Sequence, residues 1–192
     1  MSSSPPQSLI DIARRTESHL SAFLAVEEAR WSGFDSDLTS PVAEISRLVA
    51  SGGKRLRPAF SHWGFVGAGG DPNSQVSLDT GAALELLHAF ALFHDDIMDG
   101  SLTRRGAAVT HEVFADQHRN TGGSGEARRY GEGIAILVGD LAFVYSDQLM
   151  GDAPLAAREI WHELRIELNI GQLLDLIGTS LNERRRYKTE RI

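Results

Sequence analysis

Residues 81–106 read GAALELLHAFALFHDDIMDGSLTRRG, and this stretch decides the fold. Its first half, residues 81–93, is apolar on nearly every side of a helix, which predicts a helix buried inside a bundle. The helix ends in three carboxylates, of which Asp95 and Asp99 lie one turn apart on the same face. A buried helix with an acidic end needs a counter-charge. The pattern therefore indicates either a structural acidic helix end or, as we favour, a site for a metal ion or a diphosphate.

Two arginines, Arg104 and Arg105, follow just beyond the predicted end of this helix. Carboxylate oxygens are the ligands that Mg²⁺ prefers, and guanidinium groups bind phosphate oxygens through paired hydrogen bonds. Carboxylates that hold Mg²⁺, beside arginines that bind oxyanions, suit a substrate with a diphosphate group. This end of the stretch therefore indicates phosphate-ester chemistry.

A second basic segment, residues 51–58, reads SGGKRLRP. Its two glycines allow unusual backbone angles, and Pro58 suits the first turn of a following helix. Backbone freedom, cationic side chains and a helix N-terminus together form a good anion site, although a basic turn is often merely solvated. Two basic clusters and one acidic cluster indicate two phosphorylated groups and their metals. We expect Arg55 to be solvated, and we interpret His94 and His111 as ordinary packed or surface histidines.

Five short patterns follow one another along the chain: residues 52–58 (GGKRLRP), His88, residues 95–99 (DDIMD) with 104–106 (RRG), residues 139–141 (GDL) and residues 171–175 (GQLLD). In this order they resemble the trans-isoprenyl diphosphate synthases, or polyprenyl synthetases, and the resemblance extends from about residue 40 to about residue 178. It implies a reaction in which an allylic diphosphate ionises with Mg²⁺ assistance, isopentenyl diphosphate attacks the carbocation, and a proton is lost. The product is a longer all-trans prenyl diphosphate.

The resemblance assigns metal and catalytic roles to the acidic end of the helix. Asp95 and Asp99 are expected to coordinate Mg²⁺, with Mn²⁺ as a substitute, and Asp96 to hold or tune the same metal site. Arg104 is expected to bind the allylic diphosphate, so that it serves catalysis as well as binding. The isopentenyl diphosphate is expected to bind without a metal to a cationic set made of Lys54, Arg57, His88 and Arg105.

Three further residues match the family in the last part of the chain. Gln172 and Asp175 share a helix face and match a third substrate-binding pair, although a routine polar helix face has the same pattern. Lys188 resembles the lysine of a Lys-Thr pair that contacts the allylic diphosphate, a catalytic and binding role. The charged run before it, residues 183–186, fits a frayed basic helix end equally well.

The length of the product is expected to depend on the residues that precede Asp95. In the family, bulk at the fourth and fifth positions before this aspartate limits the growing chain, and here these are Ala91 and Phe90. The small Ala91 beside the large Phe90 resembles the short-chain pattern that makes the C20 geranylgeranyl product, with the C15 farnesyl product as the next alternative. Plain core packing is the other interpretation of Phe90.

The composition fits one folded enzyme. The chain has 192 residues, of which 42% are hydrophobic, and this predicts a single domain over residues 1–192. The formal net charge of -7 argues against nucleic acid as a partner, because binders of a phosphate backbone are normally basic. The chain has no cysteine, so metal binding falls to oxygen ligands. It shows neither a long uninterrupted apolar run nor a secretory signal, so we expect a cytoplasmic protein without stable membrane insertion, in which residues 1–8 are disordered.

Apolar residues recur at helical spacing throughout, and no run of alternating β-branched residues occurs. The expected fold class is therefore all-α, an antiparallel helix bundle around a central cavity, and the resemblance implies the isoprenoid synthase type. It also implies a homodimer through helices near residues 78–93 and 134–149, or a partner synthase subunit. The helices are predicted at residues 9–26, 38–50, 59–66, 76–98, 134–150 and 155–177.

Complete members of the family carry a second Asp-rich motif on a later helix, and no such motif follows Asp175 in this chain. We therefore expect a C-terminally incomplete bundle, and several interpretations stay open. The basic segment favours an elongating prenyltransferase or its N-terminal part, whereas the missing motif favours a catalytically incomplete fragment or a non-catalytic accessory subunit of a prenyl synthase. A class I terpene cyclase is disfavoured, because it has no second diphosphate for residues 51–58 to bind.

Overall fold

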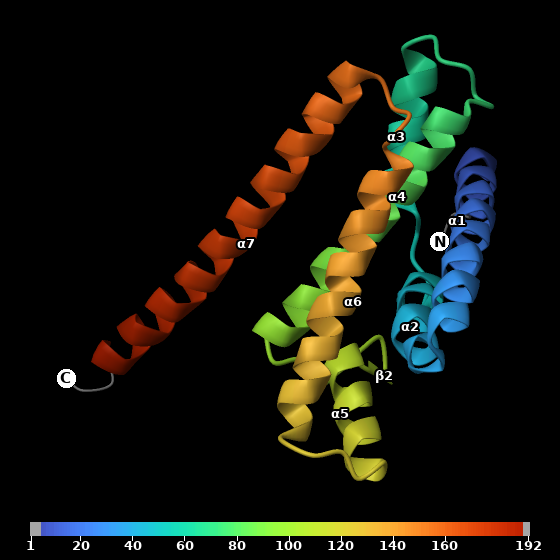
Figure 1. The fold of residues 1–192 in the computed structure, drawn as a ribbon. Helices are drawn as coiled ribbons and strands as arrows, with labels where there is room; N and C mark the ends of the chain where they lie inside the picture. Colours follow the sequence, from blue (N-terminus) through green and yellow to red (C-terminus); the bar gives the residue numbers. More distant parts are fainter. Residues whose placement is uncertain (1–4, 190–192) are drawn as a thin grey trace. The chain divides into compact units, whose positions relative to one another are not determined.

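The computed structural model describes the backbone of residues 5–189 and the side chains of residues 5–178. Contacts within the chain define two compact units, Met1–Asp152 and Ala153–Ile192. The first unit is built almost entirely from helices joined by short loops (Figure 1). Its elements are α1 (Gln7–Phe34), the 3₁₀ helix η1 (Ser36–Leu38), α2 (Thr39–Ala50), α3 (Leu56–Gly67), α4 (Gln75–Met98), β1 (Thr103–Arg104), β2 (Ala107–Ala108), α5 (Thr110–Asn120) and α6 (Ala127–Leu149).

The described part of the second unit contains one long helix, α7 (Leu155–Thr189). It begins where a helix was expected and continues beyond the predicted end at residue 177. The prediction of an all-α fold is confirmed, since the only strands in the described residues are β1 and β2, which have two residues each and form one hairpin. Of the segment expected to be disordered, residues 1–4 lie outside the described residues, and Gln7 and Ser8 already belong to α1.

The core of the first unit lies where α4 and α6 pack side by side, with α1 and α2 against them (Figure 1). The apolar half of α4 supplies much of this core, which confirms that residues 81–93 form a buried helix. Among the described residues α4 alone is long and apolar enough to cross a membrane, and 56% of its most apolar window is buried within the chain. Its apolar surface is therefore largely covered by the bundle. The core residues are Leu20, Leu24, Ile45, Ala82, Leu86, Ala89, Phe93, Val138, Ala142 and Tyr145.

Glycines allow two close approaches of helices to α4. A Cβ atom on Gly139 of α6 would lie 2.5 Å from the ring of His94 and 3.2 Å from the Cβ of Phe93. A Cβ atom on Gly81 would lie 3.2 Å from the Cβ of Pro58 at the start of α3. Distances under about 3.4 Å leave no room for a side chain without movement of its neighbours. Gly139, the first residue of the GDL pattern, is thus a packing residue between α6 and α4.

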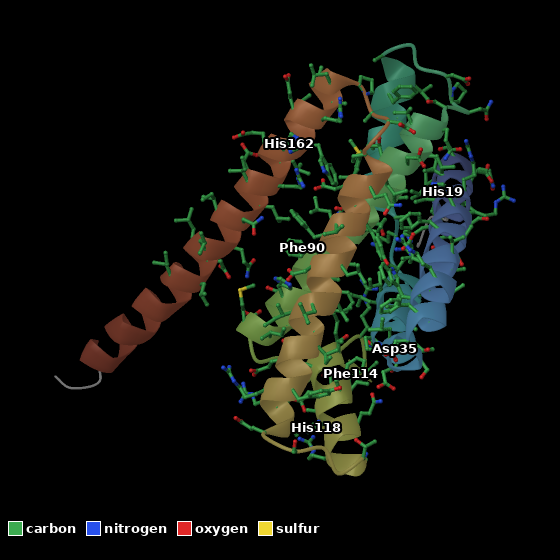
Figure 2. All side chains as sticks on the ribbon, in the orientation of Figure 1. His19, Asp35, Phe90, Phe114, His118 and His162 are labelled. Carbon is green, nitrogen blue, oxygen red and sulfur yellow. The ribbon has the colours of Figure 1, made fainter. Side chains whose placement is uncertain are left out.

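Three features of the fold were not predicted, and one is that α6 begins at Ala127 rather than at residue 134. The helix α5 is absent from the expected set, because most of its residues are polar and only a short face, including the buried Phe114 (Figure 2), reaches α6. The helix α1 continues well past the predicted end at residue 26. Its last turns are held by polar contacts with α6, where the Trp31 indole donates to the Tyr145 hydroxyl at 2.9 Å, and hydrophobic periodicity does not report such contacts.

Candidate functional site

The loop between α2 and α3 carries the basic segment and turns through left-handed backbone conformations. Gly52 has φ 97°, which suits glycine, whereas Arg55 adopts φ 49° and ψ 38°, a region that other residues seldom occupy. The helix α3 begins directly afterwards at Leu56, and Pro58 is its third residue. Pro58 therefore stands in the first turn, as predicted, where a missing backbone N–H costs no helical hydrogen bond.

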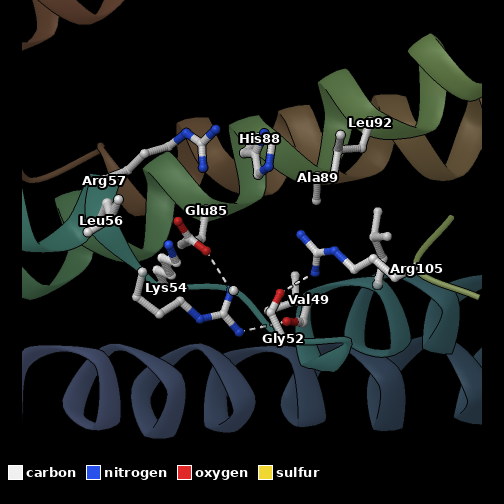
Figure 3. Close-up of a pocket in the computed structure, with 13 residues that line it drawn as sticks. Val49, Gly52, Lys54, Leu56, Arg57, Glu85, His88, Ala89, Leu92 and Arg105 are labelled. Carbon is white, nitrogen blue, oxygen red and sulfur yellow. Dashed lines mark hydrogen bonds and ion pairs between the residues drawn. The ribbon is translucent and has the colours of Figure 1, made fainter. Parts of the chain in front are cut away.

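This loop forms one wall of a pocket of about 150 Å³ in the first unit, which we call the cationic pocket (Figure 3). The opposite wall is the middle of α4, and the hairpin β1–β2 contributes Arg105. The four residues expected to bind isopentenyl diphosphate all line it. The lining residues are Leu48, Val49, Gly52, Gly53, Lys54, Arg55, Leu56, Arg57, Glu85, His88, Ala89, Leu92 and Arg105.

His88 lies between two arginines in this pocket. Arg57 and Arg105 reach toward it from opposite ends of the hollow (Figure 3). Burial, together with the positive charges of these two arginines, lowers the pKa of His88 to about 4. His88 is therefore neutral near pH 7, and its ring can donate one hydrogen bond without adding a charge.

The hairpin that carries Arg105 has a two-residue turn of the type that favours positive φ. Thr103 pairs with Ala108 and Arg104 pairs with Ala107, so the turn residues are Arg105 (φ 53°) and Gly106 (φ 81°). The guanidinium group of Arg105 donates to the Ser51 hydroxyl at 3.1 Å and to the carbonyl of Gly52. These bonds hold Arg105 against the loop between α2 and α3, although Ser51 lies 54 residues earlier in the sequence.

The acidic helix end, made of Asp95, Asp96 and Asp99, lies at the C-terminus of α4. Gly100 adopts φ 62° and ends the helix, since its amide and that of Ser101 bond back to Ile97 at 3.2 Å and to Asp96 at 2.9 Å. This sharp stop sends the chain directly into the hairpin that bears both arginines.

Arg104 is bound to the acidic helix end. Its Nε donates to Oδ1 of the buried Asp96 at 2.9 Å, and its Nη2 contacts Asp95 Oδ2 at 3.2 Å. The hydrogen bond that Arg104 donates to Asp96, with the charges of both aspartates, raises the pKa of Arg104. Asp96 is thus buried and fixes the position of Arg104, whereas the side chain of Asp95 is one-third exposed and Asp99 is exposed.

The donor set at this end fits Mg²⁺. No group of three or more carboxylate or imidazole side chains converges on a metal position in the described residues. Mg²⁺ is commonly held by only one or two carboxylates, the remaining ligands being water and substrate phosphates. Asp95 and Asp99 provide two such carboxylates one turn apart. They suit a metal that arrives with a diphosphate, rather than one that the protein binds alone.

Arg55 differs from its prediction. The expectation that it is solvated is wrong, because its side chain is only 6% exposed and forms ion pairs with Glu85 at 2.5 Å and Glu17 at 3.0 Å. Burial alone would lower the pKa of Arg55, but the bonds to these two carboxylates outweigh it and raise that pKa. A signal was present in the sequence: Glu85 is the one carboxylate within the apolar run 81–93, and a buried carboxylate requires a cationic partner.

His94 and His111 are both packed. The Nε2 atom of His94 lies 3.2 Å from the carbonyl of Ile136 and 3.4 Å from the carboxylate of Asp140, which places the GDL segment next to the helix end. His111 on α5 is 4% exposed. Neither lines the cationic pocket, in agreement with their interpretation as ordinary histidines.

The residues expected to control product length lie on α4 outside the cationic pocket. The ring of Phe90, labelled in Figure 2, lies 4.7 Å from the ring of Phe143 on α6 and 4.7 Å from that of His94. Ala91 is half-buried beside it. Phe90 therefore packs in the bundle, and its effect on product length stays a prediction.

The remaining predicted residues belong to the second unit. Gln172 and Asp175 lie on α7, three residues apart, with Gln172 partly buried and Asp175 exposed. The side chain of Lys188 lies outside the described residues. The structure therefore brings together the predicted residues of the first unit, and the roles of these three stay predictions.

Known proteins resemble this chain over most of its length. The profile of the polyprenyl synthetase family matches residues 41–191. A short chain isoprenyl diphosphate synthase from Methanothermobacter thermautotrophicus is 33% identical over 62% of this chain and 31% of its own length. A geranylgeranyl diphosphate synthase from Sulfolobus acidocaldarius is 38% identical over 55% of this chain and 27% of its own length. The chain thus spans about a third of these relatives.

A solved structure has the same fold. The geranylgeranyl pyrophosphate synthase from Corynebacterium glutamicum, complexed with isoprenyl diphosphate and magnesium, superimposes with a TM-score of 0.80 at 36% identity. The superposition covers 87% of this chain and 50% of that one. The bundle described above is therefore about half of the fold of that structure.

Proposed function

The chain belongs to the polyprenyl synthetase family, and from this premise we propose that it acts in a prenyltransferase that condenses isopentenyl diphosphate with an allylic diphosphate. The main observation behind this proposal is that one helix, α4, contributes to two candidate diphosphate sites, one lined by cationic side chains and one formed by carboxylates with Arg104. His88 in the cationic pocket and Asp95 at the acidic helix end are seven residues apart on α4, or about 10 Å along the helix. Two diphosphates bound there would lie next to each other, as a condensation requires.

The cationic pocket is proposed to bind isopentenyl diphosphate. Lys54, Arg57 and Arg105 supply three positive charges, and these offset the charge of a diphosphate without a metal. His88 adds a neutral N–H donor. Apolar residues of the same pocket wall provide surface for the isopentenyl group; these are Ala89 and Leu92.

The acidic helix end is proposed to bind the allylic diphosphate together with Mg²⁺. When bound, the metal would neutralise the negative charge that develops on the departing diphosphate. Asp95 and Asp99 would hold it, while Arg104 supplies a permanent positive charge whose position Asp96 maintains. The loss of diphosphate leaves the allylic carbocation for the double bond of isopentenyl diphosphate.

We assign a C20 product, with C15 as the alternative. The small Ala91 leaves room one turn from Asp95, whereas Phe90 is bulky and packed against Phe143. A growing chain that passes along this face of α4 would be limited by Phe90. Replacement of Phe90 by alanine is then expected to lengthen the product.

The test is a product assay with the 192-residue chain. Mg²⁺ and labelled isopentenyl diphosphate are supplied with dimethylallyl, geranyl or farnesyl diphosphate in turn, and the products are sized. The double variant Asp95→Asn/Asp99→Asn is expected to lose turnover, whereas Asp37→Asn, a change of an exposed carboxylate on η1, is expected to retain it.

Two outcomes would contradict the proposal. Turnover that persists unchanged in the Asp95→Asn/Asp99→Asn variant would remove the assignment of the acidic helix end. Release of a hydrocarbon from an allylic diphosphate without any need for isopentenyl diphosphate would instead identify a terpene cyclase.

A further inference from the structure

Arg55 joins three helices of the first unit at one buried point. Its Nη1 donates to Glu85 on α4 at 2.5 Å, its Nε donates to Glu17 on α1 at 3.0 Å, and its Nη2 donates to the carbonyl of Val49 on α2 at 2.6 Å. The side chains of Arg55 and Glu85 are each only 6% exposed. A planar guanidinium group can satisfy three partners in three directions, which a lysine ammonium on its flexible stem does less well.

The backbone of Arg55 shows that these contacts determine the shape of the loop. Its left-handed conformation (φ 49°, ψ 38°) is unfavourable for a residue with a Cβ atom and persists only where the surroundings impose it. Because the side chain of Arg55 is anchored inside the bundle, the adjacent Lys54 and the nearby Arg57 lie exposed on the pocket side. A loop released from this anchor would relax from the left-handed turn and move both cations.

Glu85, the buried partner of Arg55, also lines the cationic pocket. It lies beside Lys54 (Figure 3), one helical turn from His88. Its Oε2 binds Arg55, whereas its Oε1 is buried and accepts no hydrogen bond in the described part of the chain. The Arg55–Glu85 pair is therefore part of the pocket wall, and a change in this pair acts directly on the lining of the pocket.

We propose that Arg55, through its ion pairs with Glu85 and Glu17, is a positioning residue that holds Lys54 and Arg57 in place for a diphosphate. The inference rests on the proposed function, which supplies the diphosphate. Stability alone does not explain the buried pair, since replacement of such a pair by apolar residues is often neutral. Its value lies in the geometry that it imposes on the loop.

The test removes both charges of the buried pair at once. Arg55→Met/Glu85→Met keeps the net charge and much of the volume, and it leaves no unpaired charge inside the bundle. The matched control is Arg47→Met/Glu44→Met, which removes the Arg–Glu pair of α2 that bonds at 2.7 Å and does not line the pocket. Circular dichroism and thermal unfolding establish that each variant is folded.

Two readouts decide the outcome. Calorimetry measures the Kd for isopentenyl diphosphate, and NMR titration of the imidazole signals measures the pKa of His88. In the folded Arg55→Met/Glu85→Met variant we expect the Kd to weaken at least about tenfold. Arg55→Lys keeps a positive charge near His88 but not the three-way geometry. In this variant we expect the Kd to weaken as well, and the pKa of His88 to rise toward its usual range as Arg57 moves away.

A folded double variant with a Kd within about twofold of the unmodified chain would overturn the positioning role, and so would an unchanged His88 pKa in Arg55→Lys. If the double variant does not fold, Arg55→Lys decides by the same readouts, and wild-type behaviour of that variant overturns the role. If the unmodified chain itself binds no isopentenyl diphosphate, the proposed function fails. The His88 titration still decides the role of Arg55 in that case, because it needs no ligand.

Discussion

Gly139 offers a direct test of how closely α6 must approach the acidic end of α4. Its replacement by alanine adds one methyl group, which would lie 2.5 Å from the ring of His94 and 3.2 Å from the Cβ of Phe93. The His94 ring cannot turn aside freely, since it lies against the ring of Phe90 and the carbonyl of Ile136. The Cβ of Phe93 belongs to the buried part of α4. Either α6 or the end of α4 must therefore shift.

The size of the effect follows from a comparison with Gly133 on the same helix. A Cβ atom on Gly133 has no neighbour within 4 Å, so Gly133→Ala should gain the full helix propensity of alanine, about 1 kcal/mol. Gly139→Ala gains the same propensity but also incurs an overpacking cost of about 1–3 kcal/mol. Because the propensity gain cancels between the two variants, their free energies of unfolding should differ by about 1–3 kcal/mol.

Urea unfolding followed by circular dichroism measures this difference. Gly133→Ala is the matched control, since it makes the same chemical change six residues earlier in α6. We expect Gly139→Ala to be the less stable variant and to have lower prenyltransferase turnover, because the displaced His94 directly precedes Asp95. Free energies of unfolding that agree within about 0.3 kcal/mol would refute the packing role of Gly139.

Three further predictions concern the site. The folded-state pKa of His88 is lowered to about 4, so the unfolded chain binds more protons than the folded chain between about pH 4 and about pH 6.5, and the free energy of unfolding falls as the pH drops through this window. After discounting for solvent screening, this loss is about 1–2 kcal/mol. Urea unfolding of His88→Gln should show a smaller loss over the same pH range. Arg104→Lys should lower kcat about tenfold to a hundredfold, because a lysine lacks the rigid planar group with which Arg104 contacts Asp95 and Asp96. An unchanged kcat would show that charge alone suffices. EDTA should abolish turnover but leave the calorimetric Kd for isopentenyl diphosphate unchanged, and a parallel loss of binding would show that this diphosphate also requires the metal.

The hairpin shows what local sequence can and cannot predict. Two arginines followed by glycine were assigned to diphosphates, but nothing in the sequence indicated that they occupy different positions around a two-residue turn. Arg104 points back to the acidic helix end and Arg105 points to the basic loop. Adjacent residues can serve two sites because the positive φ at Arg105 and Gly106 reverses the chain between them.

Arg55 shows the opposite case, in which a local pattern was misleading. A cation in a glycine-rich loop is normally solvated, and its immediate neighbours give no reason to expect otherwise. Its two carboxylate partners lie 38 residues before it and 30 residues after it. Pairing at such distances depends on which helices become neighbours, and a single sequence does not contain that information in any local form.

By itself the sequence determined the helical class, the burial of the middle of α4 and the identity of the groups at its acidic end, because helical periodicity and carboxylate spacing are local properties of the chain. Only the tertiary structure decided which charges meet. It placed Lys54, Arg57, His88 and Arg105 around one pocket, buried Arg55 against Glu85, and set Asp96 behind Arg104. The reason is physical: desolvation and ion pairing depend on three-dimensional neighbours, and those neighbours come from helix packing rather than from adjacent residues.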